Sequence, residues 1–393
     1  MVVSAIGAAP ADMAARATLD TPTRLLLDST AQGLVRFDAA GQIEAGLAER
    51  WTVIDGGMTY IFRLRSARWS DGSAVTAGEV VDALRHQLDE RSHNPLAPFL
   101  TAIADIVVMT PQVIEVQLKR PRPDLLRLFA QPELAVVRSG SAMGTGPFRN
   151  AGPLLRPVPD PARTDPDDPK PQRPEDDIRL IGERASLAIA RFAAHRSDLV
   201  TGGSVVDWPL LAADGEIAPA NVRIDPAAGL FGFAIVDRSG FLVRPAQRAA
   251  IAEAIDRAAV TAAIAPGWTP AETILPDTLD SAGAPATPSW LPLSLSDRLA
   301  EAREQVRSWP GGAVVLRIAI PPGPGGTLLR GAIHASLTRI GIGIVWVGMD
   351  QPADLRLIDA VAPYDSARWY LATACQLCSD EARAALAAAR EAP

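Results

Sequence analysis

The most distinctive spacing for chemistry belongs to two cysteines, Cys375 and Cys378, in the stretch "ACQLCSDEA". A CxxC pair is typical of redox motifs in a thioredoxin setting, and it can form half of a zinc site. The chain has no other cysteine, and its four histidines lie far away in the sequence. We therefore interpret the pair as a local disulfide, or as two small buried residues at a helix start. Redox or metal chemistry is the alternative, and we expect no metal site.

Carboxylates are the next candidates, because general acid–base catalysis uses a carboxyl or histidine whose pKa is shifted in a pocket. The carboxylates are scattered along the chain, and the sequence gives no ground for placing any two of them close together. It also has no GxxxxGK[ST] phosphate loop, no GxSxG elbow and no HExxH zinc motif. Glycine-rich loops at 144–147 and 323–326 are interpreted as turns. We expect no catalytic residue, no enzyme activity and no cofactor. The carboxylates considered are Asp28, Asp71, Asp207 and Asp365.

Charge and hydropathy argue against a nucleic-acid-binding protein and against a membrane-spanning one. Lys and Arg number 38 and Asp and Glu number 45, so the net charge is −7, and the basic residues form no run. Nucleic-acid binding is therefore not expected. No apolar stretch is long enough to cross a bilayer, so the protein would be peripheral to a membrane at most. The first twenty residues lack the basic region of a signal peptide.

The elements that must position any site begin with an alternating strand over 58–65, followed by a turn at Asp71–Gly72. Thr76 and Glu79 have the spacing of a capping box, which predicts a helix from Thr76 onwards. Two strands near 103–109 and 112–118 are read as a hairpin. Residues 152–177 hold eight prolines. Because proline lacks an amide donor, we predict an extended loop there.

The second half of the chain has a different pattern. It predicts a mixed α/β architecture, because the last strand, helix and strand form a βαβ unit with parallel strands. The predicted strands are 178–182, 229–236, 313–320 and 343–348, and the predicted helices are 184–195, 245–264 and 327–340.

Several blocks, taken in order, carry a family resemblance. The chain is similar to the family 5 extracellular solute-binding proteins, which serve ABC importers of peptides, dipeptides and nickel. It departs from the family pattern in the proline-rich loop and in the short region after residue 350. The matching blocks are Gly41, 47–51 (LAERW), 62–65 (FRLR), 69–72 (WSDG), 76–81 (TAGEVV), 144–148 (GTGPF), 244–257 and 337–347.

The resemblance implies an α/β fold with two lobes, of the periplasmic-binding-protein type II, cluster C-like, with a small auxiliary α+β subdomain in the first lobe. In this scheme residues 1–35 and 145–230 form lobe I, and 36–144 form the auxiliary subdomain. Residues 231–393 form lobe II, which we expect to be truncated. The 69–72 motif would be scaffold in the auxiliary subdomain.

The function implied is that of a receptor for an ABC importer, which closes two lobes over a small ligand, peptide-like by family default. Its partners would be that solute and the permease subunits of the transporter. We expect a monomer located in the periplasm. The alternative is a degenerate family member that acts as a protein-interaction or regulatory module without a transport ligand.

Candidate ligand-binding positions lie where the chain is expected to cross between lobes. Trp208 could stack on an apolar group, and Asp207 or Asp365 could pair with an amine. A structural role is the alternative for each residue: Trp208 could anchor a loop, and one of the two alternating phenylalanines could belong to the core. The candidates are Asp28, Ser29, Thr30, Gly202, Gly203, Asp207, Trp208, Phe231, Phe233, Tyr364 and Asp365.

Overall fold

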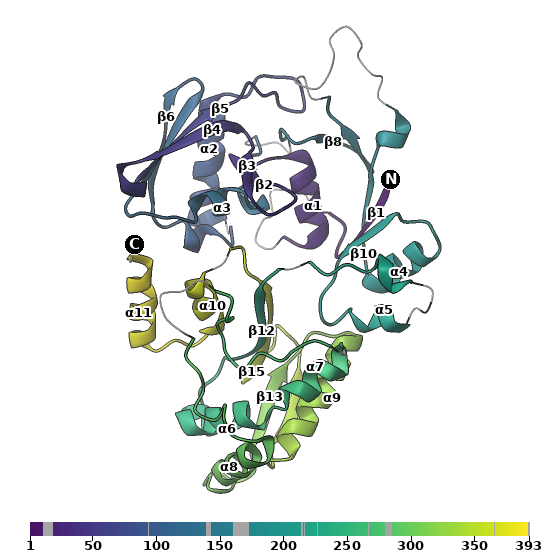
Figure 1. Ribbon diagram of the computed structural model, residues 1–393, viewed down its shortest axis with the longest axis vertical. Helices are drawn as coiled ribbons and strands as arrows, with labels where there is room; N and C mark the ends of the chain where they lie inside the picture. Colours follow the sequence, from purple (N-terminus) through teal and green to yellow (C-terminus); the bar gives the residue numbers. More distant parts are fainter. Residues whose placement is uncertain are drawn as a thin grey trace. The chain divides into compact units, whose positions relative to one another are not determined.

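The structure is a computed structural model, and the chain in it divides into two compact units, one from Met1 to Gly202 and one from Gly203 onwards (Figure 1). Strand β12 (Gly229–Ile235) pairs within unit 2. The lobe bounds at 144/145 and 230/231 that the family resemblance implies remain predictions. The further subdivision of the first lobe at residues 36 and 144 remains a prediction. The structure describes residues 1–10, 19–92, 94–138, 143–159, 173–213, 215, 217–225, 227–265, 267–279, 285–364 and 366–391.

Unit 1 contains a parallel sheet built around the first strand of the chain. Strand β1 (Val2–Ile6) lies between β10 (Arg179–Glu183) and β11 (Leu199–Gly202). Helices α1 (Thr21–Thr30) and α4 (Ala185–Ala193) contact this sheet. The strand and helix predicted over 178–195 are therefore confirmed.

A second sheet of unit 1 is antiparallel, with β4 (Ala48–Ile54), β5 (Thr59–Leu64), β7 (Val113–Leu118) and β6 (Ile103–Thr110) side by side in that order. The alternation places Tyr60, Phe62 and Leu64 in the core, while Arg63 on the opposite face is exposed. Helix α2 (Ala77–Leu88) covers the sheet by packing on β6 and β7 (Figure 1). The predicted hairpin and helix are both confirmed.

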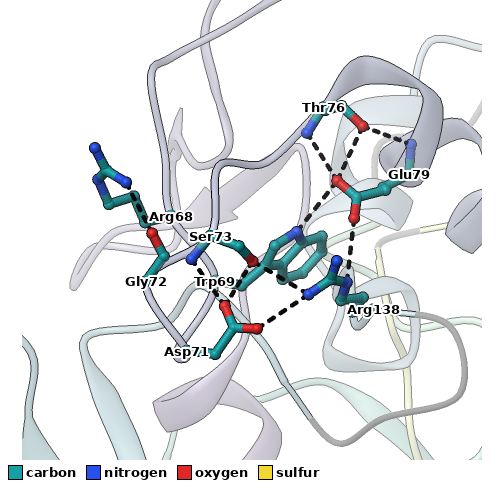
Figure 2. Close-up of polar contacts among 8 residues, drawn as sticks. All are labelled: Arg68, Trp69, Asp71, Gly72, Ser73, Thr76, Glu79 and Arg138. Carbon is teal, nitrogen blue, oxygen red and sulfur yellow. Dashed lines mark hydrogen bonds and ion pairs between the residues drawn. The ribbon is translucent and has the colours of Figure 1, made fainter.

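The 69–72 motif forms a turn between β5 and helix α2, and Figure 2 shows the polar contacts around it. Trp69 is 2% exposed, and its indole Nε1 donates to Glu79 Oε2 over 3.3 Å. Thr76 and Glu79 form the predicted capping box, since each backbone amide donates to the other's side chain. The Arg138 guanidinium lies 3.1 Å from both Glu79 and Asp71. This network explains why a tryptophan, a DG turn and a capping box occur together.

The proline-rich segment is not a loop throughout, so the prediction for 152–177 is wrong near its ends. Strand β9 (Leu154–Pro157) forms a hairpin with β8 (Phe148–Ala151). The backbone of Leu155 also exchanges two hydrogen bonds with Ile178, and Pro157 ends the strand, where its missing amide is tolerated. Pro174–Asp176 is a short 3-10 helix, η5. Residues 160–172 lie outside the described part of the chain.

Unit 2 contains a mixed sheet in the order β12, β15 (Leu355–Val361), β13 (Val315–Ala319) and β14 (Gly343–Val347). Helix α9 (Pro324–Thr338) connects the parallel neighbours β13 and β14, which confirms the predicted βαβ unit. Strand β12 is antiparallel to β15. The other helices of eight or more residues in the described part of this unit are α6 (Pro245–Ala254), α7 (Arg257–Ile264), α8 (Leu295–Arg307), α10 (Ala367–Ala374) and α11 (Asp380–Glu391).

The single helix predicted over 245–264 is wrong, because the chain forms two helices there. Ile255 leaves α6 in an extended conformation, and Asp256 accepts a hydrogen bond from the Ala259 amide over 3.0 Å as the N-cap of α7. The Asp256 amide donates to Ser336 of α9. An aspartate satisfies the open amides of a first helical turn, and it did so here against a run of strong helix formers.

The remaining described elements are short. They include β2 (Val35–Phe37) and β3 (Ile43–Ala45), which pair with each other in unit 1. None of the helices that the structure describes has the length and apolar character needed to cross a bilayer. The others are α3 (Leu125–Phe129), α5 (Pro209–Ala213), η1 (Asp55–Gly57), η2 (Glu90–Ser92), η3 (Ala97–Phe99), η4 (Pro132–Leu134), η6 (Pro219–Asn221) and η7 (Gly240–Val243).

The network around Trp69 gives a first prediction. Replacing Glu79 by Ala removes the capping box and the acceptor for the Trp69 indole, so we expect unfolding in urea at pH 7 to become easier by about 1 to 2 kcal/mol. Glu79→Gln should retain more stability, because an amide oxygen still accepts from Thr76. Unchanged stability of Glu79→Ala would contradict this role.

Because of the same network, the difference in unfolding free energy between wild type and Glu79→Gln should depend on pH. Desolvation raises the pKa of Glu79, but hydrogen bonds from Thr76 and Trp69 and the charge of Arg138 outweigh it, so the pKa is lower than its ordinary value. A folded-state pKa below the unfolded one stabilises the fold above the unfolded value, and this contribution disappears as the pH falls through the folded value. Urea unfolding measured across the acid range should show that the extra stability of wild type over Glu79→Gln shrinks as the pH falls. Extra stability that grows in acid would contradict the lowered pKa of Glu79.

Candidate functional site

A cavity of about 680 Å³ lies within unit 2, between the sheet and its helices. Phe231 and Phe233 of β12 line one side, and Leu355 and Leu357 of β15 extend that side. The opposite walls come from α6, α7 and α9 and from the segment 267–271. These walls include Ile251, Ala252, Val260, Ile264, Trp268, Leu329 and Ile333. The volume is within the range of small-molecule sites, which are mostly apolar with a few polar groups.

The break between α6 and α7 shapes this cavity. Ile251 and Ala252 face it from the end of α6, and Val260 and Ile264 face it from α7. A continuous helix would project its side chains along one straight stripe. The change of direction at Ile255 instead lets two short helices contribute walls to the same space.

Two arginines, Arg248 and Arg257, are the charged residues among the described lining of the cavity, and no carboxylate lines it there. Arg248 is half-buried, and its Nη1 donates to the carbonyl oxygens of Leu242 and Val243 over 2.9 and 2.7 Å. Desolvation lowers the pKa of Arg248, and the nearby positive charge of Arg238 adds to the effect. The polar end of the cavity is therefore positive.

Arg257, unlike Arg248, has both an ion pair and an aromatic contact within the protein. Its Nη1 lies 3.4 Å from Glu272, and its guanidinium lies over the Trp290 ring, 4.8 Å from the centroid. Desolvation lowers the pKa of Arg257, the charge of Glu272 opposes this shift, and the charge of Arg298 adds to it. Glu272 is thus shared between two arginines.

Three of the predicted site residues gather at this cavity. Phe231 is 41% exposed, whereas Phe233 packs against the core of unit 2. Trp208 also packs on that core, and its ring lies 5.4 Å from that of Trp268, which lines the cavity. An exposed aromatic side chain beside an apolar cavity can provide a surface for an apolar ligand group.

Asp207 lies close enough to Asp359 for its charge to contribute to the raised pKa of Asp359. Asp207 is held by the Ser204 amide, which donates to it over 3.1 Å, and Asp359 pairs across the sheet with Phe231. Desolvation raises the pKa of Asp359, and the charge of Asp207 raises the pKa further, whereas a hydrogen bond from the Val205 amide lowers it. Asp359 nevertheless keeps an accessible surface. Our sequence reasoning missed Asp359. Its signal was an acidic residue inside the apolar strand "LRLIDAV".

Three more of the predicted residues do not join this group: Gly202, Gly203 and Tyr364. Tyr364 is buried, with 6% of its surface exposed, and Asp365 lies outside the described residues. Gly202 and Gly203, at the division between the units, have φ angles of +86° and +87°, which favour glycine. A Cβ at Gly202 would also lie 2.8 Å from the Thr21 side chain.

Three predicted residues of unit 1, Asp28, Ser29 and Thr30, lie on the last turn of α1. Thr30 is buried, and its hydroxyl donates to the Leu26 carbonyl, which is a structural role, while Ser29 is half-buried. Asp28 keeps an accessible surface, yet the surrounding protein removes much of the water around its charge. This desolvation raises the pKa of Asp28 to about 6; Arg24 lowers it and Glu133 raises it.

Cys375 and Cys378 form a disulfide between α10 and α11 in the structure. Within the described ranges, no group of three or more His, Cys, Asp or Glu side chains is placed to hold a metal ion. The cavity of unit 2 is therefore the arrangement that the structure offers most directly for binding a solute.

Comparison with solved structures shows which fold the chain has. The fold matches that of the Escherichia coli murein tripeptide binding protein MppA, with a TM-score of 0.81 and 19% identity over 100% of this chain and 86% of that one. It also matches Burkholderia pseudomallei OppA, with a TM-score of 0.79 and 17% identity over 100% of this chain and 87% of that one. The fold is thus that of the two-lobed periplasmic binding proteins, as expected.

The family follows from the sequence. The model of the bacterial extracellular solute-binding proteins, family 5, matches residues 42–308, which is well over half of the chain. The protein therefore belongs to this family, and the resemblance noted in the sequence is confirmed.

Two curated relatives are from Escherichia coli strain K12. A probable deoxycholate-binding periplasmic protein is 32% identical over 133 residues, which is 29% of this chain and 25% of that protein. A glutathione-binding protein is 27% identical over 141 residues, which is 33% of this chain and 28% of that protein. The matched region thus spans only about a quarter of each relative.

The proximity of Asp207 and Asp359 is testable. Replacing Asp207 by Asn keeps an oxygen for the Ser204 amide but removes the negative charge, so the pKa of Asp359 should fall towards its ordinary value. Carbon-13 NMR titration of the Asp359 carboxyl measures this directly. Asp297→Asn at the first turn of α8 is the control and should leave the titration unchanged. Identical Asp359 titrations in wild type and Asp207→Asn would contradict the interaction.

Proposed function

We propose that this protein is the solute-binding receptor of an ABC importer, that it works in the periplasm without catalysing a reaction, and that its ligand enters the cavity of unit 2. Membership of the family 5 extracellular solute-binding proteins supports the receptor role. The observation that carries the proposed location is the 680 Å³ cavity beside the exposed aromatic Phe231.

The energetics of such a cavity favour an occupant. Its walls are mostly aliphatic and aromatic side chains that a well-packed core would bring into contact with one another. A space of this size forfeits dispersion contacts, which an apolar ligand would restore. The arginines at the cavity would then orient the ligand, since a few polar groups usually determine orientation in an apolar site.

Hinge closure belongs to the same proposal. Gly202 and Gly203 are consecutive residues with positive φ at the point where the chain leaves unit 1. A short segment of this kind is a suitable hinge, because few residues need to change conformation. We propose that Asp28 and Ser29 of unit 1 contribute to ligand recognition after closure, and that the closed form is what the permease subunits recognise.

The ligand class can be approached through the relatives. The names of similar proteins mention deoxycholate, glutathione and a murein tripeptide. These solutes differ widely in polarity, so we propose for this chain only that the ligand is small and has a substantial apolar part. That part would contact Phe231 and Phe233.

The experiment is thermal unfolding of the purified chain against peptides, bile acids, fatty acids, glutathione, sugars and metal chelates. A ligand at 100 times its dissociation constant stabilises the fold by about 2.7 kcal/mol, which should raise the melting temperature clearly. We expect a selective shift with a solute that has an apolar part. A cooperative transition that no solute shifts would contradict the receptor role and favour an interaction module.

A variant that fills the cavity tests the location separately. Ala252→Phe places a ring where α6 lines the cavity, so it should abolish the shift produced by the solute while the free protein still unfolds cooperatively. Ala249→Phe is the matched control, because Ala249 is also on α6 but does not line the cavity. This variant should retain the shift. A full shift in Ala252→Phe would mean that the solute binds elsewhere.

A further inference from the structure

We infer that the solute of the unit 2 cavity is an amphipathic carboxylate, an apolar body that carries one anionic end, and that Arg248 binds this end. The inference rests on the proposed function, because it assigns a chemical class to the same site. It follows from the polarity of the walls and from the hydrogen bonds that Arg248 makes and leaves unmade.

Arg248 has only part of its hydrogen-bonding capacity committed to the protein. A guanidinium has five N–H donors, and the two on Nη1 face the carbonyl oxygens of Leu242 and Val243. Among the described residues, no protein acceptor pairs with the Nε and Nη2 donors, and no carboxylate forms an ion pair with Arg248. The edge formed by Nε and Nη2 is the one that binds a carboxylate through two parallel hydrogen bonds.

The surroundings of Arg248 favour an anion over other groups. Of the two arginines in the described lining, Arg257 is paired with Glu272, whereas Arg248 has no carboxylate partner there, and Arg238 adds a positive charge near Arg248. Arg248 is half-buried and partly desolvated, and an anion brought by the ligand would compensate for the lost hydration. A cationic ligand would be repelled, and a neutral one would leave the guanidinium edge unpaired.

The apolar walls determine the rest of the ligand. Phe233, Ile251, Ile264 and Leu329 leave a space that suits a hydrocarbon chain or ring system. The two retained carbonyl contacts hold the guanidinium in place before the ligand arrives, so little side-chain entropy is lost on binding. Apolar burial and one charged contact together define the class.

The test compares decanoate, 1-decanol and propionate by isothermal titration calorimetry with the full chain at pH 7.5. Decanoate has both features of the class, decanol lacks the charge and propionate lacks the apolar body. We expect decanoate to bind at least tenfold more tightly than decanol, and propionate to give no measurable heat. The tenfold preference should fall with increasing salt, since it depends on charge.

Variants then assign the charge preference to Arg248. In Arg248→Gln, decanoate should bind no better than decanol, while decanol binding is unchanged. Arg248→Lys loses the same carbonyl contacts but keeps the positive charge, so it should still prefer decanoate over decanol. That result would show that Arg248→Gln does not act through misfolding. Arg307→Gln, on an exposed part of α8, is the control and should behave like wild type.

The outcomes separate this inference from the proposed function. Equal binding of decanoate and decanol, lost in Ala252→Phe, would overturn the carboxylate class but leave the cavity as the site. Binding of decanoate that Ala252→Phe does not affect would overturn the site and the class together. A preference for decanoate that survives Arg248→Gln would overturn the role of Arg248.

Discussion

The interaction on which the candidate site depends is the N-cap that Asp256 makes for α7. Its carboxylate accepts from the Ala259 amide, and its own amide donates to Ser336 of α9. These bonds stop α6 at Ala254 and start α7 at Arg257 in a segment rich in alanine. Without the break, the apolar faces of the two helices could not both border one cavity.

The second constraint is the antiparallel pairing of β12 with β15 at the edge of an otherwise parallel sheet. Register places Phe231 opposite Asp359 and Phe233 opposite Leu357. The phenylalanines lie beside the cavity, and desolvation together with the charge of Asp207 raises the pKa of the Asp359 carboxyl. One strand pair thus supplies a wall of the apolar cavity and also the carboxylate of Asp359.

Local patterns in the sequence were enough to predict much of the fold. Alternation over 58–65, the capping box of Thr76 and Glu79 and the βαβ unit after residue 313 were readable because each is encoded by neighbouring residues. The break at Asp256 was not, since helix propensity favours a continuous helix and the choice depends on Ser336, eighty positions away. For the same reason Phe231 and Trp208 could be proposed from the sequence, but Asp359 and Arg248 required the tertiary packing.

Whether a solute occupies the unit 2 cavity can be measured by methyl NMR of isoleucine-labelled protein titrated with decanoate. We predict that the signals of Ile251, Ile264 and Ile333, which line the cavity, shift with the titration. Those of Ile106 and Ile114, buried in the antiparallel sheet of unit 1, should stay in place. Cavity methyl signals that remain unchanged at saturating decanoate would contradict the account.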